Sequence, residues 1–83
     1  MKSKKLNTSN KLLTPQSGTT VYIDYLEDKK VLEVGFTATK SYHYFGVEPE
    51  VWLEYKDMVL SGGSSGEFVN KRIKPYFDYK EIN

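Results

Sequence analysis

Three stretches in which side chains alternate in character follow one another between residues 19 and 47. They are TTVYIDYL (19–26), VLEVGFT (31–37) and SYHYFGV (41–47), and they are rich in β-branched and aromatic residues. A period of two places successive side chains on opposite faces of a strand, so each stretch predicts a β-strand. Only short charged or polar segments separate them. The sequence therefore predicts a three-stranded antiparallel meander.

The alternation also assigns side chains to the two faces of this sheet. On the third strand Tyr42 and Tyr44 share one face, and His43, the only histidine of the chain, lies on the other. Glu33 is predicted to mark the solvent face, with Asp24 opposite it across the hairpin as a second solvated carboxylate. The apolar face of the first strand is predicted to carry Val21, Ile23 and Tyr25.

Two helical patterns follow the strands. EPEVWLEYKDMVL (48–60) has a proline near its first turn, early acidic residues and apolar residues at helical spacing, which together predict an amphipathic helix. A second helix over 65–74 is predicted from the capping-box spacing of Ser64 and Glu67, and it ends before Pro75. The predicted core-facing residues are Val51, Trp52, Tyr55, Met58 and Val59 in the first helix and Phe68, Val69 and Ile73 in the second.

These elements predict one α+β domain, a three-stranded antiparallel β-meander packed on two helices. At 83 residues the chain holds one domain at most, and its core must be compact. We expect the domain to span residues 19–79, after a flexible basic N-terminal arm at 1–18 and before a frayed tail at 80–83. The segment YFDY (76–79) is interpreted as either a short further strand or an extended segment.

Composition excludes several classes of protein. The chain has no cysteine and one histidine, so we expect no disulfide framework, no metal site and no cofactor. No apolar run reaches the length of a signal-peptide core or the roughly 18 residues of a membrane span. We therefore expect a cytoplasmic protein that does not bind a membrane.

Charge is distributed unevenly along the chain. Residues 1–20 carry four lysines and no acid, whereas residues 21–83 carry eight basic and eleven acidic side chains, a net charge of −3. Because binding to a phosphate backbone needs clustered cations, the body is a poor general nucleic-acid binder unless its cations share one face. The basic arm is either a solvated leader or an aid in holding a polyanion.

No arrangement typical of a catalytic site is found in the sequence. The run GGSSG (62–66) is rich in glycine like a phosphate-binding loop, but Glu67 follows it where that motif needs a lysine. We interpret the run as a connector between helices. His43 is interpreted as a half-exposed surface residue rather than a general base, and no nucleophile is paired with it. We do not expect an enzyme.

The remaining candidate site combines aromatic and basic side chains. Rings on a sheet stack the bases of single-stranded RNA in several folds, and lysine or arginine contacts the phosphates. The alternative is that the tyrosines fill the core, because their face opposes the helices. Asn70 either locks the fold through a hydrogen bond, which we favour, or contacts the ligand. The candidate ligand-binding residues are Tyr42, Tyr44, Asn70, Lys71, Arg72 and Lys74.

Two spaced motifs carry a resemblance to a known family. The first is Y-x-Y at Tyr42 and Tyr44, and the second is S-x-G-x-F-x-N-x-x-I-K in SSGEFVNKRIK (64–74). In this order, over residues 21–79, the sequence resembles the KTSC domain, a module that occurs alone in bacterial and phage proteins and at the C-terminus of some lysyl-tRNA synthetases. Thr39 stands where the family usually has glycine, so the geometry of that turn is open.

The resemblance implies RNA binding only through the family's association with a tRNA-charging enzyme. From the residues and the resemblance together we predict a small non-enzymatic binding module for RNA or another nucleotide-containing ligand. The alternative prediction is a protein-interaction or accessory factor encoded by a phage or mobile element. Such a factor would pair with a partner protein, or with itself as a homo-oligomer, through an exposed sheet edge.

Overall fold

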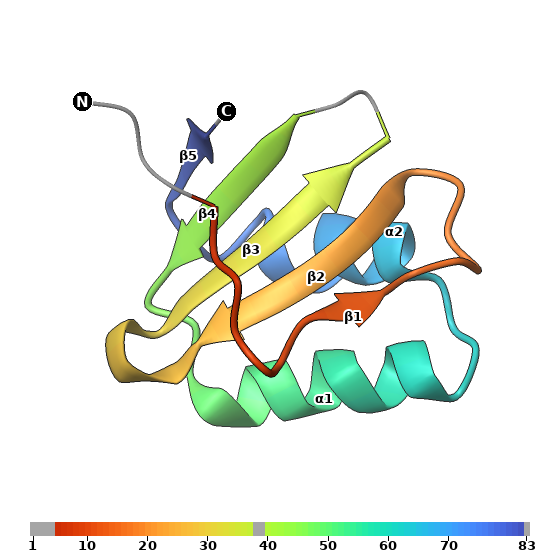
Figure 1. Cartoon of the computed structure of the whole chain (residues 1–83), viewed down its shortest axis with the longest axis horizontal. Helices are drawn as coiled ribbons and strands as arrows, with labels where there is room; N and C mark the ends of the chain where they lie inside the picture. Colours follow the sequence, from red (N-terminus) through yellow and green to blue (C-terminus); the bar gives the residue numbers. More distant parts are fainter. Residues whose placement is uncertain (1–4, 38–39, 83) are drawn as a thin grey trace.

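The structure is a computed structural model that describes residues 5–37 and 40–82. Within these residues one antiparallel sheet has five strands in the order β1-β2-β3-β4-β5, so each strand pairs with its neighbours in sequence (Figure 1). The strands are β1 (Leu12–Leu13), β2 (Thr20–Leu26), β3 (Val31–Phe36), β4 (Ser41–Phe45) and β5 (Tyr79–Ile82). The α+β class is confirmed, but the predicted number of three strands is too low.

The two additional strands lie at the edges of the sheet, where the sequence shows little alternation. β1 has only two residues and pairs with β2. β5 occupies residues that we predicted to fray, yet Ile82 is 2% exposed and lies opposite Ser41 of β4. The strand begins at Tyr79, so residues 76–78 only lead into it. Asn83, the last residue of the predicted tail, lies outside the described residues.

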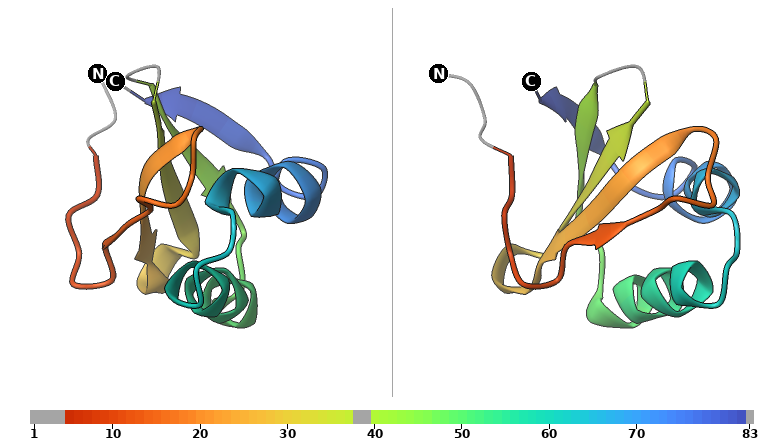
Figure 2. Two further views of the ribbon diagram at one scale, coloured as in Figure 1. Left: turned by 90° about the vertical axis from the view of Figure 1, so that its right-hand side faces the viewer. Right: turned by 45° about the vertical axis from the view of Figure 1, so that its right-hand side comes forward.

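The N-terminal segment, predicted to be a flexible arm, packs against the sheet. Residues 5–11, which we call the N-terminal strap, cross the face of the sheet opposite the helices (Figure 2). The backbone N–H groups of Leu6 and Thr8 donate to side chains of β3 and β2, at 2.6 and 3.0 Å. β1 extends this contact by pairing with β2. Residues 1–4, the first part of the predicted arm, lie outside the described residues.

In the described part of the chain two α-helices, α1 (Pro49–Leu60) and α2 (Ser65–Phe68), lie on the other face of the sheet. α2 continues into a π-helical segment, η2 (Val69–Ile73). The predicted capping serine is confirmed, because the Ser64 hydroxyl oxygen accepts from the N–H of Glu67 at 3.2 Å. No helix within these residues is long and apolar enough to cross a membrane.

The core lies between the helices and the central strands. Tyr25 of β2 stacks on Trp52 of α1 with 5.3 Å between ring centroids, and Tyr55 of α1 stacks on Phe68 of α2 at 4.4 Å. The predicted core-facing helix residues are confirmed: Trp52, Tyr55, Phe68, Val69 and Ile73 are buried, and Val51, Met58 and Val59 pack against them partly buried.

A bulge near the start of β2 interrupts the predicted alternation. Ile23 is buried as predicted, but Val21, assigned to the same face, is 48% exposed. The pairing with β3 shifts register between Thr20 and Tyr22, so Val21 has no partner of its own in the ladder. An extra residue of this kind turns the following side chains relative to the preceding ones. At its other end β2 runs through a short 3₁₀ turn, η1 (Glu27–Lys29), into β3.

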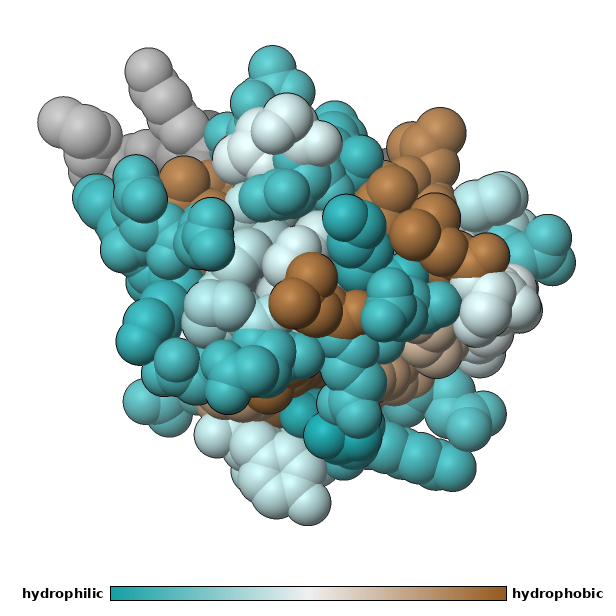
Figure 3. Space-filling model, turned by 90° about the horizontal axis from the view of Figure 1, so that it is seen from below, coloured by the Kyte–Doolittle hydropathy of each residue, from teal (hydrophilic) through white to brown (hydrophobic). Residues whose placement is uncertain are grey.

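The side of the molecule formed by α1 is mostly hydrophilic, with hydrophobic side chains in separate areas (Figure 3). The largest exposed apolar side chains near the end of this helix are Leu13 of the β1 edge and Leu60. They line a shallow groove of about 270 Å³ between the loop after β1 and the end of α1.

Candidate functional site

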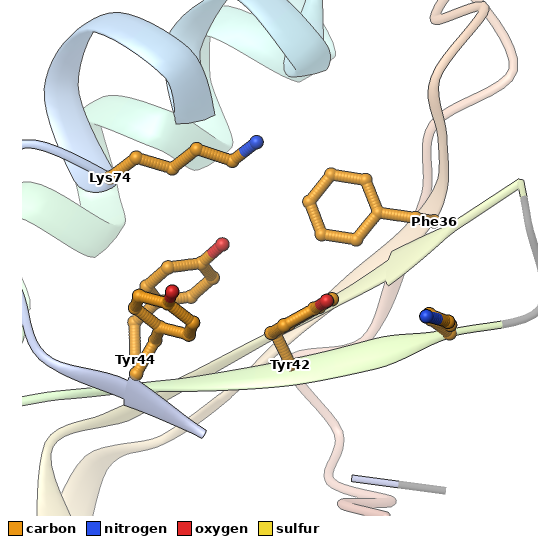
Figure 4. A pocket seen from close by; sticks show the side chains of 6 residues that line it. Phe36, Tyr42, Tyr44 and Lys74 are labelled. Atoms are coloured by element: carbon orange, nitrogen blue, oxygen red, sulfur yellow. The ribbon is translucent and has the colours of Figure 1, made fainter. Parts of the chain in front are cut away.

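A pocket opens between the end of η2 and the strands β3, β4 and β5 (Figure 4). Its volume is about 490 Å³, and rings from all three strands line it together with two lysine side chains. The strands contribute four rings, Phe36 of β3, Tyr42 and Tyr44 of β4, and Tyr79 of β5. Lys40, just before β4, and Lys74, at the end of η2, complete the lining.

Strand register brings the aromatic side chains together. Tyr42 and Tyr44 point to the same face of β4, and Tyr79 lies directly opposite Tyr44 on β5. The ring of Tyr79 lies 5.8 Å from that of Tyr42 and 6.0 Å from that of Tyr44. Phe36 meets Tyr42 edge to face at 5.6 Å. The four rings form one continuous aromatic surface, with spacings typical of favourable ring pairs.

The three tyrosines differ in how much of each ring solvent reaches. Tyr44 is 2% exposed, Tyr42 is half-buried and Tyr79 is 64% exposed. Burial, with the neighbouring Tyr42 and Tyr79, raises the pKa of Tyr44 to about 12, so its hydroxyl stays protonated at neutral pH. The core interpretation therefore holds for Tyr44, whereas Tyr79 offers a ring face to a ligand.

The two lysines of the pocket come from different segments of the chain. Lys74 reaches from the end of η2 over the aromatic surface, with its Nζ 5.4 Å from the centre of the Phe36 ring. Lys40, just before β4, has its Nζ 3.8 Å from Oε1 of Glu81. The hydroxyl of Tyr42 donates to the same carboxylate oxygen at 3.3 Å. The pocket thus combines ring faces with two ammonium groups, and the Glu81 carboxylate contacts two of its lining residues, Lys40 and Tyr42.

Half of the candidate residues predicted from the sequence lie elsewhere. Lys71 pairs with Glu67 at 3.3 Å, and Arg72 pairs with Glu54 of α1 at 2.6 Å. Asn70 is exposed, and its side chain makes no hydrogen bond within the described residues, so the structure does not support its predicted role as a lock. Of the six candidates the pocket contains Tyr42, Tyr44 and Lys74.

Three lining residues were missed from the sequence, namely Phe36, Lys40 and Tyr79. Phe36 is the last residue of β3 and meets Tyr42 edge to face. Tyr79 reaches the pocket only because β5 pairs with β4, and that pairing has no local signal in the sequence. Lys40 lies next to two residues, 38–39, that are outside the described part of the chain.

The opposite face of the sheet carries a second cluster of ionisable groups. Asp24 and Glu33 are directly opposite each other, as predicted, but both are 0% exposed, so their predicted contact with solvent is wrong. His43 is only 8% exposed, and its Nε2 lies 2.8 Å from Oε1 of Glu33. The prediction of a half-exposed histidine is therefore also wrong. These groups are buried because the N-terminal strap covers them.

Every carboxylate oxygen of this second cluster has a donor. Oε1 of Glu33 accepts from the N–H of Leu6, and Oε2 accepts from the hydroxyl of Tyr22 at 2.5 Å. The oxygens of Asp24 accept from the N–H and the hydroxyl of Thr8. No buried polar side-chain atom of residues 5–37 and 40–82 lacks a partner. The cluster is internally satisfied, which is typical of a structural network.

Neither cluster has the composition of a metal or hydrolytic site. In the part of the chain that the structure describes, no three His, Cys, Asp or Glu side chains are grouped so that they hold a metal ion. His43 is paired with a carboxylate and lies under the strap, with no reactive hydroxyl placed against its ring nitrogen. The pocket between η2 and β5 is therefore the candidate functional site.

Comparisons with known proteins agree with this architecture. The model of the KTSC domain family matches residues 16–77. The crystal structure of a KTSC domain protein from Yersinia pestis is similar with a TM-score of 0.66 and 28% sequence identity, over 81% of this chain and 89% of that one. No curated protein matches the chain significantly. Because the family match spans most of the sequence and includes both motifs, this chain belongs to the KTSC domain family.

Proposed function

We propose that this chain is a non-enzymatic binding domain for single-stranded RNA, and that the pocket holds one nucleotide of it. The observation that carries the proposal is the combination, in one open pocket, of an exposed ring with two ammonium groups. Tyr79 supplies the ring face, and Lys40 and Lys74 supply the positive charge. A nucleotide presents the complementary pair, a flat base and an anionic phosphate.

The size of the pocket and the energies of such contacts support this assignment. A volume of about 490 Å³ lies within the range of roughly 300 to 1,000 Å³ that is usual for small-ligand sites. Stacking of one base on an aromatic side chain contributes about 1 to 3 kcal/mol and tolerates any base. A single stacked base with phosphate contacts gives modest affinity, which suits a small domain that binds RNA at a few points.

Salt dependence follows from the number of lysines that face the ligand. The lysine and arginine of η2 pair with glutamates and do not line the pocket, so the phosphate contacts fall to the two lysines that line it, Lys40 and Lys74. Each phosphate contact on a single strand contributes a slope of about −0.7 in a plot of log affinity against log salt. Two contacts predict binding about fivefold weaker at about 150 mM than at about 50 mM salt.

The test is fluorescence anisotropy with labelled single-stranded RNA and tRNA at these two salt concentrations. We expect Tyr79→Ala and Lys74→Ala each to weaken binding about tenfold, in line with one lost stack or one lost phosphate contact. Lys29→Ala is the matched control, because it removes one exposed lysine from η1, at the opposite end of β3. Absence of binding at the lower salt concentration contradicts the proposal.

The competing function is self-association, and the same samples test it. β5 is an edge strand, but it has four residues and carries Lys80 and Glu81, features that discourage strand addition. The exposed Leu13 and Leu60 offer a second copy a small apolar groove instead. A mass that rises with concentration in light scattering, together with no RNA binding, would favour this function.

A further inference from the structure

A second hollow adjoins the pocket along the segment that joins η2 to β5. We call it the outer pocket; its volume is about 510 Å³, and it is more open to solvent than the first pocket. Lys74 and Tyr79 line both pockets, so the two are continuous across these side chains. The other lining residues of the outer pocket are Pro75, Tyr76, Phe77 and Asp78. A strand bound in the first pocket can therefore continue into the outer pocket without leaving the surface.

The outer pocket contains a ring that is exposed but held on a fixed backbone. Tyr76 is 72% exposed, the highest value among the large hydrophobic side chains of the described residues. Its N–H donates to the carbonyl of Ile73 at 3.1 Å, and two residues later the carbonyl of Asp78 accepts from Phe45 of β4 at 2.9 Å. One exposed ring is common on a protein surface, but this ring shares a hollow with the exposed Tyr79. A ring on a fixed backbone binds a base with little loss of conformational entropy.

The charges of the two pockets determine where a phosphate lies. Lys74 extends over the first pocket and also lines the outer one (Figure 4). Asp78 is exposed and is the carboxylate of the outer pocket, so it repels a phosphate there. The phosphate therefore belongs beside Lys74, and the outer pocket is left for the uncharged base. The three residue steps from Tyr76 to Tyr79 span at most about 11 Å of backbone, a distance suited to adjacent bases that are splayed apart.

We infer that the site binds two successive nucleotides of the RNA strand, with one base on Tyr79 in the first pocket and the next on Tyr76 in the outer pocket. Lys74 contacts the phosphate that links them. The two bases are splayed onto separate rings, as is usual where a protein holds single-stranded RNA. This inference rests on the proposed function, because it extends the site from one nucleotide to two.

The test compares two ligands that differ by one nucleoside and not in their number of phosphates. The first is pUp, one uridine with a phosphate on each side. The second is pUpU, two uridines joined by a phosphate, with another phosphate at the 5′ end. Each is titrated into the isotope-labelled full chain at low salt and followed by NMR chemical shifts. We expect pUpU to bind about tenfold more tightly, because a second base stacks, and to shift the backbone signal of Tyr76 more than pUp does.

Variants of one exposed ring assign this gain to the outer pocket. We expect Tyr76→Ala to bring the affinity for pUpU within about twofold of that for pUp and to leave pUp binding unchanged. Tyr76→Phe keeps a stacking face and should keep the tenfold gain. Phe45→Ala is the matched control, because it removes another exposed ring, which lies beside His43 on the opposite face of the sheet. Circular dichroism checks that each variant is folded.

The outcomes separate this inference from the proposed function. If pUpU binds no more tightly than pUp, including the case in which neither binds measurably, the two-nucleotide site is wrong. The titration with longer RNA then decides by itself whether the proposed function stands. A gain that survives in folded Tyr76→Ala also overturns the inference, because the second base would lie elsewhere. A gain lost in Tyr76→Ala but kept in Tyr76→Phe and Phe45→Ala supports it.

Discussion

The two faces of the sheet each carry a glutamate paired with a basic side chain, but only one face leaves its pair open to solvent. On the strap face Glu33 is 0% exposed and lies 2.8 Å from His43. On the pocket face Glu81 lies 3.8 Å from Lys40, and both side chains are partly exposed. β4 takes part in both arrangements, because it contributes His43 to one face and Tyr42, which donates to Glu81, to the other.

This difference separates groups that stabilise the fold from groups available to a ligand. A buried carboxylate is costly unless donors surround it, and the strap supplies such donors to Glu33 and Asp24 from its own backbone. An exposed ion pair contributes little to stability, so little free energy is lost when one of its side chains contacts a ligand instead. The strap face therefore uses its polar groups internally, whereas the pocket face keeps its polar groups accessible.

The largest expected effect compares the two glutamates directly. Glu33→Ala removes the acceptor of Leu6, Tyr22 and His43 at once, and we expect it to lower the free energy of unfolding by about 3 to 5 kcal/mol. Glu81→Ala is the control, with an expected loss of at most about 1 kcal/mol. Urea denaturation of both variants measures the difference. Similar losses of unfolding free energy in the two variants would show that Glu33 stabilises the fold no more than Glu81 does.

A glycine on the strap face gives the next largest effect. The ring of Tyr22 lies so close to Gly35 that an added Cβ would come within 2.0 Å of its Cε1. We expect Gly35→Ala to displace the ring, disturb the Tyr22–Glu33 hydrogen bond and cost about 1 to 3 kcal/mol. Gly18→Ala is the control, because nothing lies within 4 Å of a Cβ there. Equal urea midpoints for the two variants would contradict the tight packing of this ring.

The sequence predicted the central strands and the helices well, because their periods of two and 3.6 appear directly in the order of residues. It did not predict that the N-terminal strap covers the face of the sheet opposite the helices. Glu33 is buried by a contact with Leu6, 27 residues away in the sequence. The polar strap has no periodicity that would predict this contact. The alternation assigned Glu33 to the correct face but not to the correct environment.

The candidate site was predicted in part for the same reason. The Y-x-Y spacing placed Tyr42 and Tyr44 on one face, and Lys74 reaches the same pocket from the end of η2. Tyr79 depends on the register of β5, a four-residue edge strand whose pairing is set by the whole sheet. Local pattern predicts which side chains share a face within a strand, whereas neighbours across strands require the three-dimensional pairing.

The strap itself supplies a smaller effect. Thr8→Ala removes the hydroxyl that donates to Asp24 while keeping the backbone N–H, so the buried carboxylate loses one of its partners. We expect a loss of about 1 to 2 kcal/mol in the free energy of unfolding. Ser9→Ala, the adjacent exposed position, should change it by less than about 0.5 kcal/mol. A neutral Thr8→Ala would indicate that the strap does not stabilise the domain through Asp24.

The last effect is a pH dependence that belongs to the strap face. Burial, followed by the hydrogen bond to the Glu33 carboxylate, raises the pKa of Tyr22 from 10.0 to about 12. The folded state therefore holds this proton more tightly than the unfolded state does. The resulting stabilisation is complete below about pH 10 and is lost as the pH rises towards about 12.

The variant Tyr22→Phe has no such proton, so its stability should fall less steeply with pH in this window. At about pH 8 the wild type should be more stable than Tyr22→Phe, and the two should converge between about pH 10 and 12. Tyr76→Phe is the control, because it removes the hydroxyl of a tyrosine that is 72% exposed and lies outside the Glu33 network. Urea midpoints across this range measure the convergence. A constant difference between wild type and Tyr22→Phe would mean that the folded state does not hold the tyrosine proton more tightly than the unfolded state does.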